Sequence, residues 1–252
     1  MMNKTAFITG ATSGIGKATA QLLAEHKFNV IICGRRADRL EELKQTLNKK
    51  VEVYTLHFDV RDEKAVTDAI HSLPDQWKEI DILVNNAGNA HGLSPIQTGN
   101  TDDWNAMMDI NVKGLLYVSR AVIPGMVNRK SGQIINIGSI AGKEVYPNGN
   151  VYCASKFAVD AITTGMRMDL NPYGIRVSGI HPGLVETEFS LVRFKGDEHR
   201  ATSVYKGFKP LTADDIANTI LFIINCPPHV MISDLTILPT AQASAIIVHK
   251  DI

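Results

Sequence analysis

A serine, a tyrosine and a lysine in the middle of the chain have the residue types and spacing for proton transfer. Tyr152 and Lys156 lie four residues apart in a helical pattern, so they share one helix face. An ammonium group beside a phenol favours the phenolate and lowers the tyrosine pKa, which permits proton exchange with an alcohol or carbonyl near neutral pH. Ser139 follows an apolar run and can donate a hydrogen bond to the same substrate oxygen.

A Tyr-x-x-x-Lys pair also occurs by chance on helix surfaces, so its interpretation depends on its neighbours in the chain. The glycine-rich stretch Thr9–Gly16 follows the first apolar run and precedes a helical pattern. Glycines there let the backbone turn sharply and let a pyrophosphate approach the helix N-terminus. The stretch lacks the Gly-Lys-Ser/Thr ending of a phosphate-transfer loop, which disfavours nucleoside triphosphate chemistry. A tight turn without a ligand is the alternative.

Two arginines, Arg35 and Arg36, follow the second predicted strand. An acidic residue at this place binds the ribose hydroxyls of NAD, whereas an arginine suits the 2′-phosphate of NADP, because guanidinium supplies paired donors to phosphate. The sequence therefore predicts NADP(H), against the alternative of two solvated arginines at a helix start. Asp59 and Val60, after the third predicted strand, are expected beside the adenine.

These residues fall at strand ends and helix starts of a repeating pattern. Short Val/Ile-rich runs, typical of parallel strands buried on both faces, alternate with amphipathic stretches. Predicted strands are 5–9, 29–33, 51–58, 80–85, 133–138, 175–180 and 235–238, and predicted helices are 15–26, 37–49, 63–73, 102–129, 151–170 and 213–225. The pattern predicts an α/β fold, a Rossmann-type doubly wound parallel sheet of about seven strands with helices on both faces.

We expect residues 1–252 to form a single domain, because no linker or repeat interrupts this alternation. The stretch 184–210 departs from it and is interpreted as a substrate loop, since long loops in compact domains are commonly functional. Thr101 and Thr212 each precede acidic residues at a helix start, and we predict that both are N-caps.

Composition narrows the classes of function. The chain has 26 Lys and Arg against 26 Asp and Glu, which removes the basic excess that nucleic-acid or membrane-surface binding needs. No apolar run is long enough to span a bilayer, and the first residues carry no secretion leader. Cys33, Cys153 and Cys226 have no metal-ligand or disulfide spacing, so we expect a cytoplasmic protein without a metal site.

Taken together, the motifs resemble those of the classical short-chain dehydrogenase/reductase family. The resemblance covers residues 5–190. It is carried by Thr9–Gly16, Asn85–Gly88, Asp109–Val112, Gly138–Gly142, Tyr152–Lys156 and His181–Gly183.

The resemblance implies a role for each catalytic residue. Tyr152 is the general acid/base, Lys156 lowers its pKa and holds the nicotinamide ribose, Ser139 orients the carbonyl, and Asn111 organises a water-linked proton relay to Lys156. From both lines of argument, the expected cofactor-binding residues are Gly10, Thr12, Ser13, Gly14, Ile15, Gly16, Arg35, Arg36, Asp59, Val60, Asn86, Ala87, Gly88, Tyr152, Lys156, Pro182, Gly183, Val185 and Thr187.

Within the family, the chain is similar to the NADP-dependent 3-hydroxy acid dehydrogenases, which include serine and allo-threonine dehydrogenases. This similarity rests on Asn86–Gly92, Gly114–Leu116, Tyr146–Tyr152, Gly183–Asp197 and Pro239–Gln242. It implies oxidation of a small 3-hydroxy acid, such as serine or 3-hydroxypropionate, or the reverse reduction. Sulfoacetaldehyde reductases are similar over the same segments, so reduction of sulfoacetaldehyde or a ketone stays open. A non-catalytic NADP-sensing protein is the third alternative.

An anionic substrate needs a positive or hydrogen-bonding group beyond the reacting carbon. Arg193 and Tyr146 are the candidates, to be joined at the substrate by Ser139 and Tyr152. A solvated arginine on a mobile loop is the alternative for Arg193. The helices 102–129 and 151–170 carry more apolar positions than one core stripe needs, and in the family such faces pair in a homotetramer.

Overall fold

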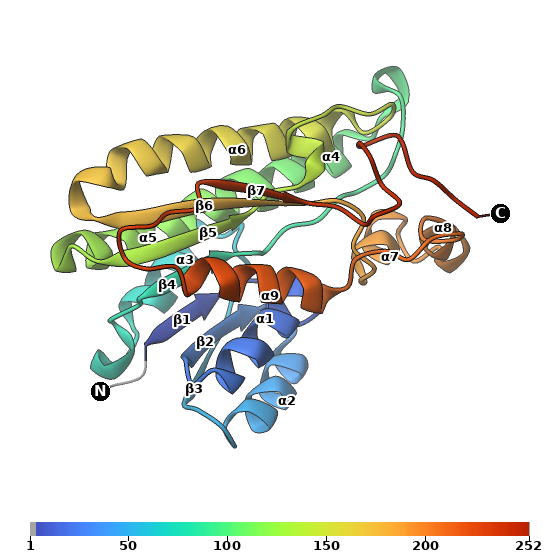
Figure 1. Ribbon diagram of the computed structural model, residues 1–252. Helices are drawn as coiled ribbons and strands as arrows, with labels where there is room; N and C mark the ends of the chain where they lie inside the picture. Colours follow the sequence, from blue (N-terminus) through green and yellow to red (C-terminus); the bar gives the residue numbers. More distant parts are fainter. Residues whose placement is uncertain (1–3, 252) are drawn as a thin grey trace.

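Seven parallel strands form one sheet in the computed structural model, which describes residues 4–251 (Figure 1). The strands lie in the order β3-β2-β1-β4-β5-β6-β7. The chain therefore runs from β1 outward to β3, returns to β4 on the other side of β1, and continues outward to β7. The doubly wound parallel sheet predicted from the sequence is confirmed. The strands are β1 Thr5–Ile8, β2 Asn29–Gly34, β3 Val53–His57, β4 Ile82–Asn85, β5 Gly132–Ile137, β6 Ile175–Pro182 and β7 Asp234–Ile237.

Helices cover both faces of the sheet (Figure 1). One layer holds α1 Gly14–Glu25, α2 Ala37–Leu47 and α9 Ala213–Ile224, and the other holds α3 Glu63–His71, α4 Thr101–Met108, α5 Leu115–Arg129 and α6 Asn150–Leu170. Successive residues of β1 alternate between the two cores: Phe7 packs with α3 and α5, and Ile8 packs with α1 and α9. Burial on both faces explains the unbroken apolar strand sequences. Within residues 4–251 no helix has the length and hydropathy to cross a membrane.

The predicted helix 102–129 is divided by a π-helical turn, Asp109–Gly114, between α4 and α5. Such turns cluster at functional sites. The Thr101 cap prediction is wrong, because the Asn100 side chain accepts hydrogen bonds from the N–H groups of Asp102 and Asp103 at 2.8 and 3.1 Å, and the helix begins one residue earlier. Thr212 does cap α9, in a reciprocal capping box.

The stretch 184–210 contains two short helices, α7 Phe189–Arg193 and α8 Glu198–Ser203. Its ends meet, since the Leu211 N–H donates to the Leu184 carbonyl at 3.0 Å. Asp251 lies against it, with its N–H donating to the Gly207 carbonyl at 2.8 Å. Figure 1 places α7 and α8 together beyond one end of the sheet.

Candidate active site

The glycine loop between β1 and α1 leaves the start of α1 accessible to an anion. Gly10 and Gly14 have φ of +67° and +50°, a region that favours glycine. A Cβ at Gly16 would lie 2.5 Å from the Asn86 amide nitrogen, so only glycine fits there. In the described structure the Ser13 side chain makes no capping bond to α1, which leaves the first N–H groups for a ligand. The loop therefore fits a dinucleotide pyrophosphate.

Asn86 and Ala87 hold the loop in shape from β4. The Asn86 side chain donates to the carbonyls of Thr9 at 2.8 Å and Gly10 at 3.3 Å, and the Ala87 N–H donates to the Thr9 hydroxyl at 2.9 Å. These groups support the loop by contacts that the sequence did not reveal.

Arg36 lies across the glycine loop. Its guanidinium donates to the Thr12 hydroxyl at 2.8 and 3.1 Å and to the Ser13 hydroxyl at 2.8 Å. Its remaining nitrogen, Nη1, donates to Glu188 at 2.9 Å, and Arg39 Nη1 donates to the other Glu188 oxygen at 2.7 Å. Arg39 and Glu188 were missed from the sequence, although Arg39 follows Arg36 at a helical spacing of three.

Arg35 points away from this group. Its side chain is 57% exposed, and Nη1 lies 3.7 Å from Asp59. Asp59 is held by Arg61, whose Nη2 donates to it at 2.7 Å. Next to it Val60 is buried, and Gly114 allows close packing there because a Cβ would lie 2.7 Å from the Val60 side chain. Of the two predicted arginines, only Arg36 lies beside the glycine loop.

Tyr152 and Lys156 lie one turn apart on α6, and both are buried. Lys156 Nζ donates to the Ile137 carbonyl at 3.0 Å, at the carboxyl end of β5. A Cβ at Gly142 would lie 2.6 Å from the Lys156 carbonyl, so the turn after Ser139 packs directly on α6. Burial lowers the pKa of Lys156 to about 8.

The predicted lowering of the Tyr152 pKa by Lys156 is wrong. Burial raises the pKa of Tyr152 well above its usual value, while the hydrogen bond with Ser139 and the charge of Arg193 act in the opposite direction. Lys156 points instead at the Ile137 carbonyl. The cation that faces Tyr152 is Arg193, whose Cζ lies 5.4 Å from the centre of the Tyr152 ring. The phenol is therefore protonated at neutral pH.

Asn111, in the π-helical turn, is brought to Lys156. Its side-chain amide donates to the Asn89 carbonyl at 2.8 Å and to the Ser155 hydroxyl at 3.0 Å, and its oxygen accepts from the Asn89 N–H at 2.9 Å. A Cβ at Gly88 would lie 2.9 Å from Asn111 Oδ1 and 3.6 Å from Lys156 Nζ. The Asn111 side-chain oxygen and the Lys156 ammonium therefore both face the space beside Gly88.

A polar cluster fixes the segment that follows Ser139. Lys143 Nζ lies 2.8 Å from both Asp160 on α6 and Asp234 on β7, and the buried His181 Nε2 lies 3.0 Å from Asp234. The two carboxylates and the histidine are close enough to bind a metal ion. The Lys143 ammonium is ion-paired to both carboxylates, so the cluster ties the Ser139 segment to α6 and β7.

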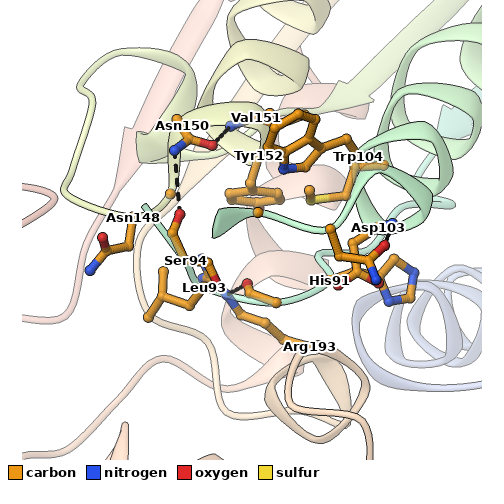
Figure 2. A pocket seen from close by; sticks show the side chains of 15 residues that line it. His91, Leu93, Ser94, Asp103, Trp104, Asn148, Asn150, Val151, Tyr152 and Arg193 are labelled. Atoms are coloured by element: carbon orange, nitrogen blue, oxygen red, sulfur yellow. Dashed lines mark hydrogen bonds between the residues drawn. The ribbon is translucent and has the colours of Figure 1, made fainter. Parts of the chain in front are cut away.

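Arg193 lines a pocket beside Tyr152 and contacts Tyr146, the other substrate-binding candidate. Figure 2 shows Tyr152 close to Trp104, with Arg193 coming from α7. Arg193 Nη2 donates to the Tyr146 hydroxyl at 2.9 Å, and Nε donates to the Gly92 carbonyl at 3.2 Å. Phe189, which the sequence did not single out, packs on Tyr152 with ring centres 5.7 Å apart.

The segment 182–187 crosses from β6 to the glycine loop. The Leu184 N–H donates to Gln242 at 2.9 Å, and a Cβ at Gly183 would lie 2.2 Å from the same Gln242 oxygen. At its other end, Thr187 lies against Gly14, where a Cβ would be 3.3 Å from the threonine. Gln242, for which no role was predicted, thus holds the segment that carries the expected cofactor-binding residues Pro182, Gly183, Val185 and Thr187.

The fold and this arrangement define an α/β dehydrogenase that binds a dinucleotide at the carboxyl end of its sheet. The chain belongs to the short-chain dehydrogenase family, whose model matches residues 4–197, and it is an oxidoreductase. The family predicted from the motifs is confirmed.

The similarity to other proteins extends over almost the whole chain. The NADP-dependent 3-hydroxy acid dehydrogenase of Salmonella typhi is 45% identical over 94% of this chain and 96% of the relative. Sulfoacetaldehyde reductase 2 of Chromohalobacter salexigens is 43% identical over 99% of this chain and 100% of its own. The solved closed form of serine dehydrogenase complexed with NADP+ superposes with a TM-score of 0.92 at 43% identity, covering 98% of this chain and 100% of that one.

Proposed function

We propose that the protein transfers a hydride between NADP(H) and a small 3-hydroxy acid or its 3-oxo form. The observation that carries the proposal is the Arg193–Tyr146 pair beside the Tyr152 ring. A partly buried guanidinium pairs both oxygens of a carboxylate, and the Tyr146 hydroxyl adds a donor. The carboxylate would lie at Arg193 and the reacting carbon at Tyr152. Residues 184–210, which carry Arg193, act as the substrate loop of a single domain.

NADP(H) fits the residues at the other side of the site. The glycine loop has the left-handed φ values and the free helix start that a pyrophosphate needs, and Arg36 and Arg39 supply charge for a 2′-phosphate. When bound, the reduced cofactor supplies the hydride for carbonyl reduction.

The protein's own residues supply the proton. Because burial keeps Tyr152 protonated at neutral pH, its hydroxyl can donate to the carbonyl oxygen as the hydride arrives at the carbon. Ser139 donates a hydrogen bond to the same oxygen. Lys156 faces the space at Gly88 and returns a proton to Tyr152 through solvent, and the Asn111 side-chain oxygen lies beside the same space. Protonated Tyr152 suits carbonyl reduction, the direction in which it donates its proton.

This assignment predicts a pH dependence. The lysine ammonium is present below its folded pKa of about 8 and is lost as the pH rises through that value. We expect kcat/KM for reduction to be level between pH 6 and 7.5 and to fall by up to about tenfold per pH unit above about pH 8, as for one essential acid. Initial rates at saturating NADPH across pH 6 to 10 measure it. A profile that is flat to pH 10 would remove Lys156 from the proton path.

A substrate panel tests the proposed activity. We expect NADPH oxidation with malonate semialdehyde to have a kcat/KM at least about tenfold above that with an aryl ketone, because only the acid can pair with Arg193. Sulfoacetaldehyde is the second candidate, since a reductase of this compound is 43% identical to the chain and a sulfonate suits the same arginine. A higher kcat/KM for sulfoacetaldehyde would favour it. NADPH binding without turnover of any of these compounds would contradict the proposed substrate class.

We infer a cytoplasmic homotetramer. Leu116 on α5 and Phe157 and Met168 on α6 expose 40%, 41% and 71% of their surface, and Phe222 on α9, in the other layer, exposes 60%. Exposed apolar side chains on both helical layers support a tetramer, which needs two kinds of twofold interface. The free cysteines Cys33, Cys153 and Cys226 fit a reducing compartment. Light scattering in solution tests this inference, because it measures whether the particle has the mass of four chains.

A further inference from the structure

We infer that Glu188 is a specificity-determining residue whose carboxylate competes with the cofactor's 2′-phosphate for Arg36 and Arg39. The inference rests on the proposed use of NADP(H). It adds that a cofactor carrying a 2′-phosphate releases the start of the substrate loop, whereas one without it leaves the loop held.

The carboxylate of Glu188 takes the place that suits a phosphate. Its two oxygens accept from Arg36 at 2.9 Å and from Arg39 at 2.7 Å, each from a different guanidinium. The other donors of Arg36 are used on Thr12 and Ser13, so Nη1 is the nitrogen with which Arg36 can bind a further anion. Two anions at these donors repel each other at short range. A bound 2′-phosphate therefore displaces Glu188.

The surroundings are open enough for this exchange. The three side chains are 40–41% exposed, and Glu188 and Arg39 line a cavity of about 440 Å³ together with the glycine loop. Lys17 and Glu42 line the same cavity, and Asp38 and Glu42 are the other carboxylates that act on Arg39. Half-exposed ion pairs are weak, so a phosphate dianion with two arginines can replace them.

The position of Glu188 links the two ends of the site. It immediately precedes α7, whose first residue, Phe189, packs on Tyr152, and whose last residue, Arg193, donates to Tyr146. Among the described residues 4–251, Glu188 is the one residue of the segment 184–210 that forms ion pairs with α2 and with the turn before it. Release of Glu188 therefore removes the ion pairs at the N-terminal side of α7 and leaves Phe189 on Tyr152 and Thr187 against Gly14 as the contacts that hold it.

The test uses binding of cofactor fragments and needs no turnover. Calorimetry would compare adenosine 2′,5′-bisphosphate with 5′-AMP on wild type, Glu188→Gln and the matched control Glu186→Gln. Glu186 is an exposed carboxylate two residues away whose side chain is in no ion pair among the described residues. We expect Glu188→Gln to bind the bisphosphate about threefold to tenfold more tightly, because two ion pairs no longer compete, and to bind 5′-AMP unchanged. Glu186→Gln should match wild type for both.

Trypsin cleavage within 184–210 gives the second readout. In wild type, the bisphosphate should speed cleavage at least about twofold and 5′-AMP should not, and in Glu188→Gln cleavage should be fast without a ligand. Equal or weaker bisphosphate binding by Glu188→Gln, or bisphosphate protection of the wild-type loop, overturns the inference while NADP(H) binding stands. If wild type binds the bisphosphate no better than 5′-AMP, the proposed cofactor site and this inference both fail.

Discussion

Tyr152→Phe is expected to lower kcat for carbonyl reduction about a thousandfold, while the Kd for NADPH changes little. The substitution removes the hydroxyl that donates the proton and keeps the ring that packs on Phe189. The buried phenol is protonated at neutral pH and is the group that we propose donates the proton to the carbonyl oxygen. Single-turnover reduction monitored by NADPH absorbance, with fluorescence titration of NADPH, separates the two parameters.

Tyr173→Phe is the matched control, because Tyr173 is 38% exposed and lies just beyond the far end of α6. It should retain wild-type kcat. If Tyr152→Phe keeps more than about a tenth of wild-type kcat, the phenol is not the proton donor.

Arg193→Met has the second largest expected effect, and the effect depends on the substrate. Methionine keeps much of the aliphatic volume but loses the guanidinium that faces Tyr146 and Tyr152. We expect kcat/KM for a 3-oxo acid to fall about a hundredfold, since a charge-assisted bidentate pair is lost in a partly dry pocket. A neutral ketone of similar size should lose less than about threefold.

Arg200→Met serves as the control for a change of charge in the same loop. Arg200 lies over the Phe194 ring, with Cζ 4.4 Å from the ring centre, and is exposed. It should leave both substrates unaffected. Equal losses on acid and ketone with Arg193→Met would mean that Arg193 acts only by supporting Tyr152, and the carboxylate site would be wrong.

The sheet and its loops were predictable because their signals are local. Strands buried on both faces appear in the sequence as apolar runs such as 30–33. Gly10 and Gly14 have φ values that favour glycine, and Gly16 has no room for a Cβ. The Tyr152–Lys156 spacing placed both residues on one helix face, as the structure has them. These features depend on neighbours a few positions away in the chain.

Other features depend on contacts between distant segments, which periodicity does not report. Glu188 meets Arg36 and Arg39 across about 150 residues of chain, a separation that local patterns do not encode. The Tyr152 pKa was misjudged because burial and the direction of the Lys156 side chain decide it, and both follow from tertiary packing. The π-helical turn at Asn111 was missed because its sequence continues a helical pattern on both sides.

Transfer of deuterium tests the central claim, hydride transfer at the carbon whose oxygen Tyr152 protonates. The enzyme would be given malonate semialdehyde with NADPH deuterated at either of the two C4 positions, and the product analysed by NMR. The account predicts 3-hydroxypropionate with deuterium at carbon 3 from one of the two cofactors, and very little transfer by Tyr152→Phe. Product without deuterium from both cofactors, or equal transfer by Tyr152→Phe, would contradict it.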